Sequence, residues 1–177
     1  MKVAIIGANG QLGSDLVEVF GEDAIPLTHR DLDVTDLESL KVLNELKTDV
    51  VINTAAYVRV DDAEVEVEKA FRINAIGALN VAKACNELNA INVYISTDYV
   101  FDGAKRAPYE EEDVPNPINV YGLSKHTGGG FHKELFQEIL YYESCQLVWK
   151  SRCKREGREL CGVHDPESQN WRRDKSC

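Results

Sequence analysis

The sequence predicts an α/β fold with a parallel sheet, and two observations carry this prediction. The chain begins with a short apolar run, Val3–Ile6, which stops at a glycine-rich turn and is followed by an amphipathic stretch. Beyond the turn, apolar runs typical of buried strands alternate with segments of helical spacing as far as about Ser96. This alternation is typical of parallel sheets with right-handed crossovers.

Composition excludes several classes of protein. A length of 177 residues predicts one domain with a sizeable core, and a net charge of −10 argues against a nucleic-acid partner. Because there is no long apolar run and a strand begins at the N-terminus, we expect no membrane span, no signal peptide and a cytoplasmic location. Five cysteines without a C-x-x-C pair predict a reduced chain without a metal site.

The N-terminal strand is followed by three glycines at three-residue spacing, Gly7, Gly10 and Gly13. Gly7 allows a tight turn, Gly10 lets a pyrophosphate approach the backbone, and Gly13 lets the next helix pack closely on the strand. That helix is expected from about Leu12 to Phe20, and the positive end of its dipole would favour a phosphate. A plain glycine loop is the alternative, but the position of the turn directly after a strand favours nucleotide binding.

A second strand is expected at Ala24–Thr28, and His29 and Arg30 follow it. In nucleotide-binding units this strand ends near the adenosine ribose, where a basic residue accommodates the 2′-phosphate of NADP. Arg30 therefore favours NADP(H), while NAD(H) stays open because Asp31 lies beside it. A solvated surface charge is the alternative for Arg30.

The next strands lead to further candidate positions. Leu32 and Val34 predict a short half-buried strand, and four leucines at helical spacing predict a helix: Leu37, Leu40, Leu43 and Leu46. Val50–Asn53 reads as a buried strand. The small residues Ala55 and Ala56 after it suit close passage of a ligand, or serve only for packing.

A long helix is expected from about Asp62 to Asn89, followed by a strand at Ile91–Ser96. Asn74 lies in the apolar stripe of this helix, where its amide needs a partner, either neighbouring backbone or a group of the site. Cys85 is expected to be a small buried hydrophobic residue.

Tyr121 and Lys125 are four residues apart and would share one face of a helix. A lysine ammonium near a tyrosine favours the phenolate and lowers the tyrosine pKa, so that the phenol can donate a proton to a carbonyl oxygen. Thr97, at the end of a strand, could hydrogen-bond the same oxygen. A surface Tyr–Lys pair is the alternative, but the glycine turn and Thr97 together favour catalysis.

With these elements in place, the chain resembles the extended short-chain dehydrogenases/reductases, and within them the dTDP-4-dehydrorhamnose reductases. Matching segments run from Met1 to about Gly128: GANGQLG, LDVTD, VINTAAY, INAIGALNVA, ISTDYVFDG and PNPINVYGLSK. The resemblance implies a Rossmann-like, doubly wound parallel sheet with helices on both faces. STDYVFDG and NPINVYGLSK are its most specific motifs.

The resemblance also implies how a cofactor would be held. Five residues would bind the pyrophosphate through their backbone: Gly7, Asn9, Gly10, Gln11 and Leu12. Arg30 would lie near the adenosine ribose, and Asp33 and Val34 near the adenine. Ala55, Ala56 and Tyr57 would line the cofactor toward the nicotinamide.

For catalysis, the resemblance implies that Tyr121 is the proton donor and that Thr97 polarises the keto oxygen. Lys125 would bind the nicotinamide ribose and tune Tyr121, and Asp98 and Tyr99 would touch the sugar.

The implied reaction is NAD(P)H-dependent reduction of the 4-keto group of dTDP-4-dehydro-L-rhamnose to dTDP-L-rhamnose. The implied partner is therefore a nucleotide sugar, and a homodimer stays open. Two alternatives remain. One is a non-catalytic NAD(P)-binding protein similar to the regulatory subunit of methionine adenosyltransferase, and the other is a nucleotide-sugar epimerase or dehydratase.

The pattern breaks after Lys125. Gly128, Gly129 and Gly130 each cost about 1 kcal/mol in a helix relative to alanine, and Gly129 stands where the family has glutamate. We expect residues 1–143 to form the cofactor-binding domain and residues 144–177 to be an anomalous tail in place of most of the substrate domain. The tail carries eight Lys/Arg, five Asp/Glu and four of the five cysteines. This shift in composition leads to the hypothesis that the reading frame is truncated or disrupted there.

Overall fold

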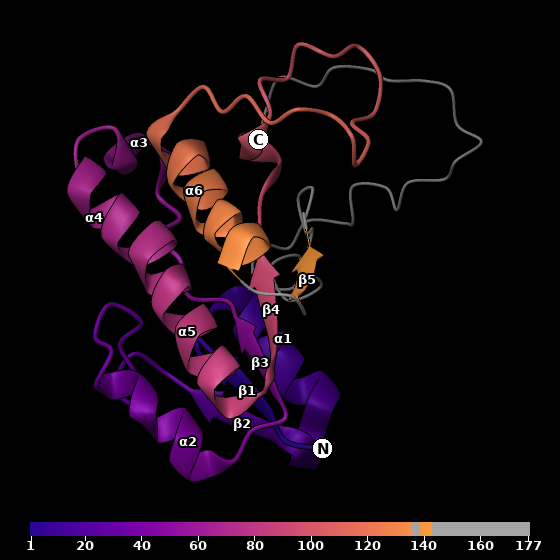
Figure 1. Ribbon diagram of the computed structural model, residues 1–177. Coiled ribbons are helices and arrows are strands. Elements are labelled where there is room, and N and C mark those ends of the chain that lie inside the picture. Colours follow the sequence, from indigo (N-terminus) through magenta and orange to yellow (C-terminus); the bar gives the residue numbers. More distant parts are fainter. Residues whose placement is uncertain (136–138, 143–177) are drawn as a thin grey trace, which may run out of the picture. The chain divides into compact units, whose positions relative to one another are not determined.

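Five parallel strands form the sheet that positions the site (Figure 1). The computed structural model describes residues 1–135 and 139–142. The sheet has the order β2-β1-β3-β4-β5. Its strands are β1 (Val3–Ile6), β2 (Ala24–Leu27), β3 (Val50–Asn53), β4 (Ile91–Ile95) and β5 (Ile139–Tyr142). The predicted α/β class with a doubly wound parallel sheet is confirmed.

The helices connect consecutive strands. They are α1 (Gln11–Phe20), α2 (Val42–Leu46), α3 (Val60–Ala63), α4 (Val67–Phe71), α5 (Ala78–Leu88) and α6 (Val120–Leu135). A π-helical segment, Arg72–Gly77, joins α4 to α5. None of the helices in the described part of the chain is long and apolar enough to cross a membrane. The expectations for residues 144–177 lie outside the described residues.

Helices cover both faces of the sheet. Alternate residues of β1 point to opposite faces, and each set packs against different helices. Val3 and Ile5 pack with Leu16 and Val17 of α1. Ala4 and Ile6 belong to a second cluster, which includes the following buried residues of α2 and α5: Leu43, Val81 and Cys85. Burial raises the pKa of the Cys85 thiol to about 12, which fits its predicted role as a small hydrophobic residue.

The strand expected at Leu32 and Val34 does not form. Both side chains are buried, but side chains and turns take the backbone hydrogen bonds that a strand ladder would use. The Asp33 N–H donates to Ser39 Oγ (2.8 Å), and Asp33 Oδ1 accepts from the Thr35 N–H (2.9 Å). The helix expected over the four leucines is also shorter, since α2 begins only at Val42 and Leu37 is exposed.

The long helix expected from Asp62 to Asn89 is divided. It ends first at Ala63, begins again at Val67, and widens to the π-helical segment at Arg72. A π-turn adds one residue to the local hydrogen-bonded ring and changes where the following side chains point. Asn74 lies in this segment and reaches groups outside the helix.

Gly128 allows α6 to pack closely against this segment. A Cβ atom on Gly128 would lie 2.3 Å from the Asn74 carbonyl oxygen and 2.7 Å from Tyr94 Oη. A Cβ atom on Gly130 would meet no described atom within 4 Å. The helix-propensity cost of Gly128 is therefore offset by a close contact that a larger residue would prevent.

We predict opposite effects for alanine at these two glycines. Gly128→Ala should lower the free energy of unfolding by about 1–3 kcal/mol, because it forces backbone and Tyr94 apart. Gly130→Ala should raise it by up to about 1 kcal/mol through helix propensity alone. Urea unfolding followed by circular dichroism measures both changes, and shifts of the same sign in the two variants would contradict the packing argument.

Candidate active site

The glycine turn between β1 and α1 forms an open backbone cradle. Gly7 has φ +81°, a conformation that favours glycine, and its N–H donates to Leu27 O (2.9 Å). A Cβ atom on Gly13 would lie 2.2 Å from Gly7 O, so glycine there allows the helix to approach the turn. Gly10 caps α1 without a side-chain hydrogen bond. The first N–H groups of α1, including those of Gln11 and Leu12, thus have no intrahelical acceptor and can bind an anion.

A cavity of about 630 Å³ lies beside this cradle. It occupies the crevice between the carboxyl ends of β1 and β3, where the strand order reverses and where open parallel sheets bind their ligands. Seven of the predicted cofactor residues line it: Gly7, Asn9, Gly10, Asp33, Val34, Ala55 and Ala56. These residues thus share one cavity, and their role in holding a cofactor stays a prediction.

Other wall residues were not assigned to the site from the sequence: Ile6, His29, Leu32, Thr35, Thr54, Lys69, Arg72 and Ile73. The spacing of Lys69, Arg72 and Ile73 places them on one helix face, a signal that could have identified them. Arg30 is exposed and is not among the residues that line the cavity. It lies in a turn closed by Asp31, whose carboxylate accepts from the Thr28 N–H (2.9 Å) and hydroxyl (2.7 Å).

Tyr57 lines a second hollow of about 420 Å³, which shares Lys69 with the first. The Tyr57 hydroxyl donates to Glu66 (2.7 Å), and this hydrogen bond raises the tyrosine pKa to about 12. Lys69 pairs with the same carboxylate (2.8 Å) and lies 5.1 Å from the centre of the Tyr57 ring. The Tyr57 side chain is thus held beside the first cavity rather than on its wall.

Asn74 connects the cavity wall with the helix that carries the other candidate residues. Its Oδ1 accepts from the Tyr57 N–H (2.8 Å), and its Nδ2 donates to Tyr57 O (3.0 Å) and to Ser124 Oγ (2.9 Å). Ser124 in turn donates to Tyr121 O (2.7 Å). The amide of Asn74 is therefore satisfied by the backbone of Tyr57 and by Ser124 Oγ, and its role in organising the site stays a prediction.

Thr97 and Tyr121 lie together, as expected. Burial raises the pKa of Tyr121, while a hydrogen bond with the Thr97 side chain opposes this by favouring the phenolate. The ring of Tyr99 meets that of Tyr121 edge-on, with 5.6 Å between the centroids. Asp98 adjoins the pair, and its Oδ1 accepts from the Thr97 hydroxyl (3.2 Å). The phenol is therefore protonated at neutral pH and has a hydroxyl partner.

Lys125 is buried, and its surroundings differ from the expectation. Its ammonium donates to Ile95 O (2.6 Å) and lies 4.3 Å from the centre of the Tyr94 ring. Burial lowers the pKa of Lys125 to about 7. The expected lowering of the Tyr121 pKa is therefore wrong for this structure, since burial of the phenol prevails and the lysine charge is itself disfavoured.

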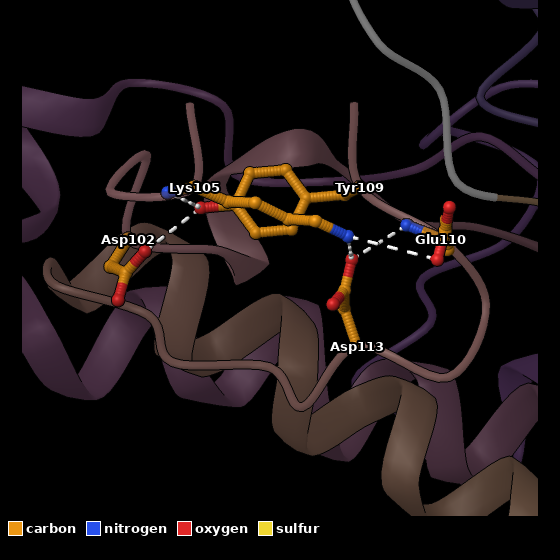
Figure 2. A network of polar contacts seen from close by, with 5 residues as sticks. All are labelled: Asp102, Lys105, Tyr109, Glu110 and Asp113. Carbon is orange, nitrogen blue, oxygen red and sulfur yellow. Dashed lines mark hydrogen bonds and ion pairs between the residues drawn. The ribbon is translucent and has the colours of Figure 1, made fainter. Parts of the chain in front are cut away.

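Side chains within the segment between Thr97 and Tyr121 make hydrogen bonds and ion pairs with one another (Figure 2). Lys105 pairs with Asp113 and lies 3.9 Å from Glu110, while the Tyr109 hydroxyl donates to Asp102 (2.8 Å). The N–H of Asn116 donates to Val100 O (2.9 Å), which fixes the return of the segment. These contacts lie within residues 100–116 and set the path of that part of the chain between β4 and α6.

The cavity and cradle fit a dinucleotide. Unpaired N–H groups face the position for a phosphate, glycines leave room for it, and a crevice extends toward Asp33. A group of acidic, histidine or cysteine side chains that could hold a metal ion does not occur within residues 1–135 and 139–142.

Comparison with known proteins supports this assignment. The family model described as "RmlD substrate binding domain" matches residues 1–140. The dTDP-4-dehydrorhamnose reductase of Mycolicibacterium smegmatis is 42% identical over 133 residues, which cover 72% of this chain and 40% of the relative. The reductase of Aggregatibacter actinomycetemcomitans is 38% identical over 132 residues, 72% of this chain and 45% of the relative.

A crystal structure of dTDP-4-dehydrorhamnose reductase from Bacillus anthracis in complex with NADP has a TM-score of 0.78 and 44% identity. The similarity covers 81% of this chain and 53% of that one. The resemblance seen in the sequence is thereby confirmed. The chain spans about half the length of these relatives.

We predict that Asn74 stabilises the fold more than a typical buried amide does. Asn74→Ala leaves the Tyr57 N–H and O without their partner and should lower the free energy of unfolding by about 2–4 kcal/mol. Asn80→Ala is the matched control, because Asn80 is also buried and donates one hydrogen bond, to Val34 O (3.0 Å). Urea unfolding compares the two, and an equal loss in both variants would refute the linking role.

Lys125 predicts a specific dependence of stability on pH. Its folded pKa of about 7 lies below the ordinary value of 10.5, so between these values the unfolded chain binds more protons. This group's contribution to stability is therefore lowest below pH 7 and rises with pH through that window. Relative to Lys125→Met, the wild type should gain about 2–3 kcal/mol of unfolding free energy from pH 6 to pH 9, measured in urea. A constant difference between the two proteins would contradict the burial of the charge.

Proposed function

Since the chain belongs to the family of the RmlD substrate binding domain, we propose that it carries the cofactor half of a carbonyl-reducing site acting on a nucleotide sugar. The reaction is NAD(P)H-dependent reduction of the 4-keto group of dTDP-4-dehydro-L-rhamnose, giving dTDP-L-rhamnose. One observation carries the proposal. Asn74 joins Tyr57, in the loop after β3, to Ser124 on the helix that carries Tyr121, and Thr54 in the same loop donates to Ile6 O (2.7 Å) beside the glycine turn.

NADP(H) is the proposed cofactor, with NAD(H) as the alternative. The residues proposed to hold it are those that line the cavity or form the cradle, with Gln11 and Leu12 contributing backbone N–H groups. The structure of the Bacillus anthracis relative with NADP supports this choice. When bound, the cofactor would supply a hydride to the carbonyl carbon.

The side chains of this chain would then handle the carbonyl oxygen. Tyr121 holds a proton at its phenol oxygen, because burial raises its pKa, and would transfer that proton to the sugar oxygen. Thr97 would hydrogen-bond the same oxygen and stabilise the phenolate that remains. Lys125 would bind the nicotinamide ribose, and Asp98 and Tyr99 would contact the sugar. Tyr57 would border the nicotinamide end.

We also propose that residues 1–143 form the cofactor-binding domain and that these residues include the catalytic ones. The family match, which ends at residue 140, supports this boundary. The relatives contain a further half that this chain does not match, so turnover is best tested with that half supplied.

The test joins residues 1–135 of this chain to the C-terminal half of the Mycolicibacterium smegmatis relative. The chimera should oxidise NADPH when dTDP-4-dehydro-L-rhamnose is added. Tyr121→Phe should lower kcat by about 10²- to 10⁴-fold and leave the Kd for NADPH almost unchanged.

Tyr109→Phe is the control, because Tyr109 lies in the segment of Figure 2 and contacts Asp102 rather than the Thr97–Tyr121 pair. Turnover that survives Tyr121→Phe would refute the proposed proton donor. NADPH binding without any oxidation would favour a binding protein over an enzyme.

A further inference from the structure

One positively charged side chain on the cavity wall, that of Arg72, has no role in the proposed function. Arg72 lines the cavity and is exposed, and its side chain makes no hydrogen bond or ion pair with any described residue. The neighbouring cations differ, because Lys69 pairs with Glu66 (2.8 Å) and Arg59 pairs with Asp62 (3.1 Å). The guanidinium of Arg72 is thus available to a ligand.

The local fold directs Arg72 to this position. It is the first residue of the π-helical segment, and Ile73 beside it also lines the cavity. Asn74, the next residue, turns away to Tyr57 and Ser124. Since π-turns change the direction of successive side chains, this segment places one cation on the cavity wall and one amide behind it.

The residues around Arg72 indicate which part of a bound dinucleotide would lie next to its guanidinium. Val34 and Ala55 line the same cavity with Ile73, and such an apolar slot suits a flat base. The Asp33 carboxylate is also on the wall, and its pKa is lowered by hydrogen bonds from Thr35 and by the charges of His29 and Arg72. An ionised carboxylate repels a second phosphate, whereas it accepts a hydrogen bond from an exocyclic amino group.

We propose that Arg72 stacks its guanidinium on the adenine of the bound dinucleotide and so fixes the base in the slot formed by Val34, Ala55 and Ile73. The planar, weakly hydrated guanidinium favours such stacking on an aromatic face. Arg72 therefore determines affinity for the adenosine part of NADPH and NADH alike. This inference rests on the proposed function, because it takes the cavity to be a dinucleotide site.

The test measures binding of three ligands to the full chain by fluorescence or calorimetry: NADPH, NADH and reduced nicotinamide mononucleotide, which has no adenosine. Arg72→Gln should raise the Kd of both dinucleotides by the same factor, about 3- to 30-fold, and leave the mononucleotide unchanged. Arg72→Lys should behave like Arg72→Gln, since lysine keeps the charge but loses the planar surface.

Arg106→Gln is the matched control, because Arg106 is exposed in the segment between β4 and α6, away from the cavity wall. A loss confined to NADPH would show that Arg72 meets the 2′-phosphate and would overturn the proposal, as would unchanged binding of both dinucleotides. If the unaltered chain binds neither dinucleotide, the proposed function itself fails, and that outcome is distinct from the other two.

Discussion

The arrangement of the site depends on the hydrogen bonds of one buried amide. Asn74 is 2% exposed and joins Tyr57, which follows β3, to Ser124, which precedes Lys125 by one residue on α6. A buried amide must find its partners within the protein, since a lost hydrogen bond in an apolar environment is costly. The loop after β3 and α6 therefore cannot move apart without leaving this amide unsatisfied.

Close backbone contacts add a second constraint of a different kind. Gly13 brings α1 onto the turn after β1, and Gly128 brings α6 onto the π-helical segment. In both places backbone occupies the space that a side chain would need. The two glycines therefore determine how closely α1 approaches the glycine turn and how closely α6 approaches the π-helical segment.

Much of this could be predicted from the sequence, because local patterns dominate there. Val3–Ile6, the three glycines and the following amphipathic stretch specify strand, turn and helix without reference to the rest of the chain. Tyr121 and Lys125 fall on α6 as the spacing indicated.

Other features depend on contacts that no local pattern records. Asn74, in the π-helical turn, has hydrogen-bond partners that lie 17 and 50 residues away in sequence. Leu32 and Val34 bury their side chains without joining the sheet. The raised pKa of Tyr121 depends on burial, which spacing cannot give. The cavity wall likewise carries Arg72 and not Arg30, because tertiary structure, which residue spacing does not record, decides which side chains line the cavity.

The internal contacts of the segment between β4 and α6 affect how this part of the sequence can change during evolution. Its charged contacts are made among Asp102, Lys105, Tyr109, Glu110 and Asp113, all within the segment itself. A substitution there can be compensated by a neighbour a few residues away, without any adjustment in the sheet. Residues 102–113 can therefore vary in sequence without disturbing the hydrogen bonds of Asn74 that hold the helix of Tyr121 in place.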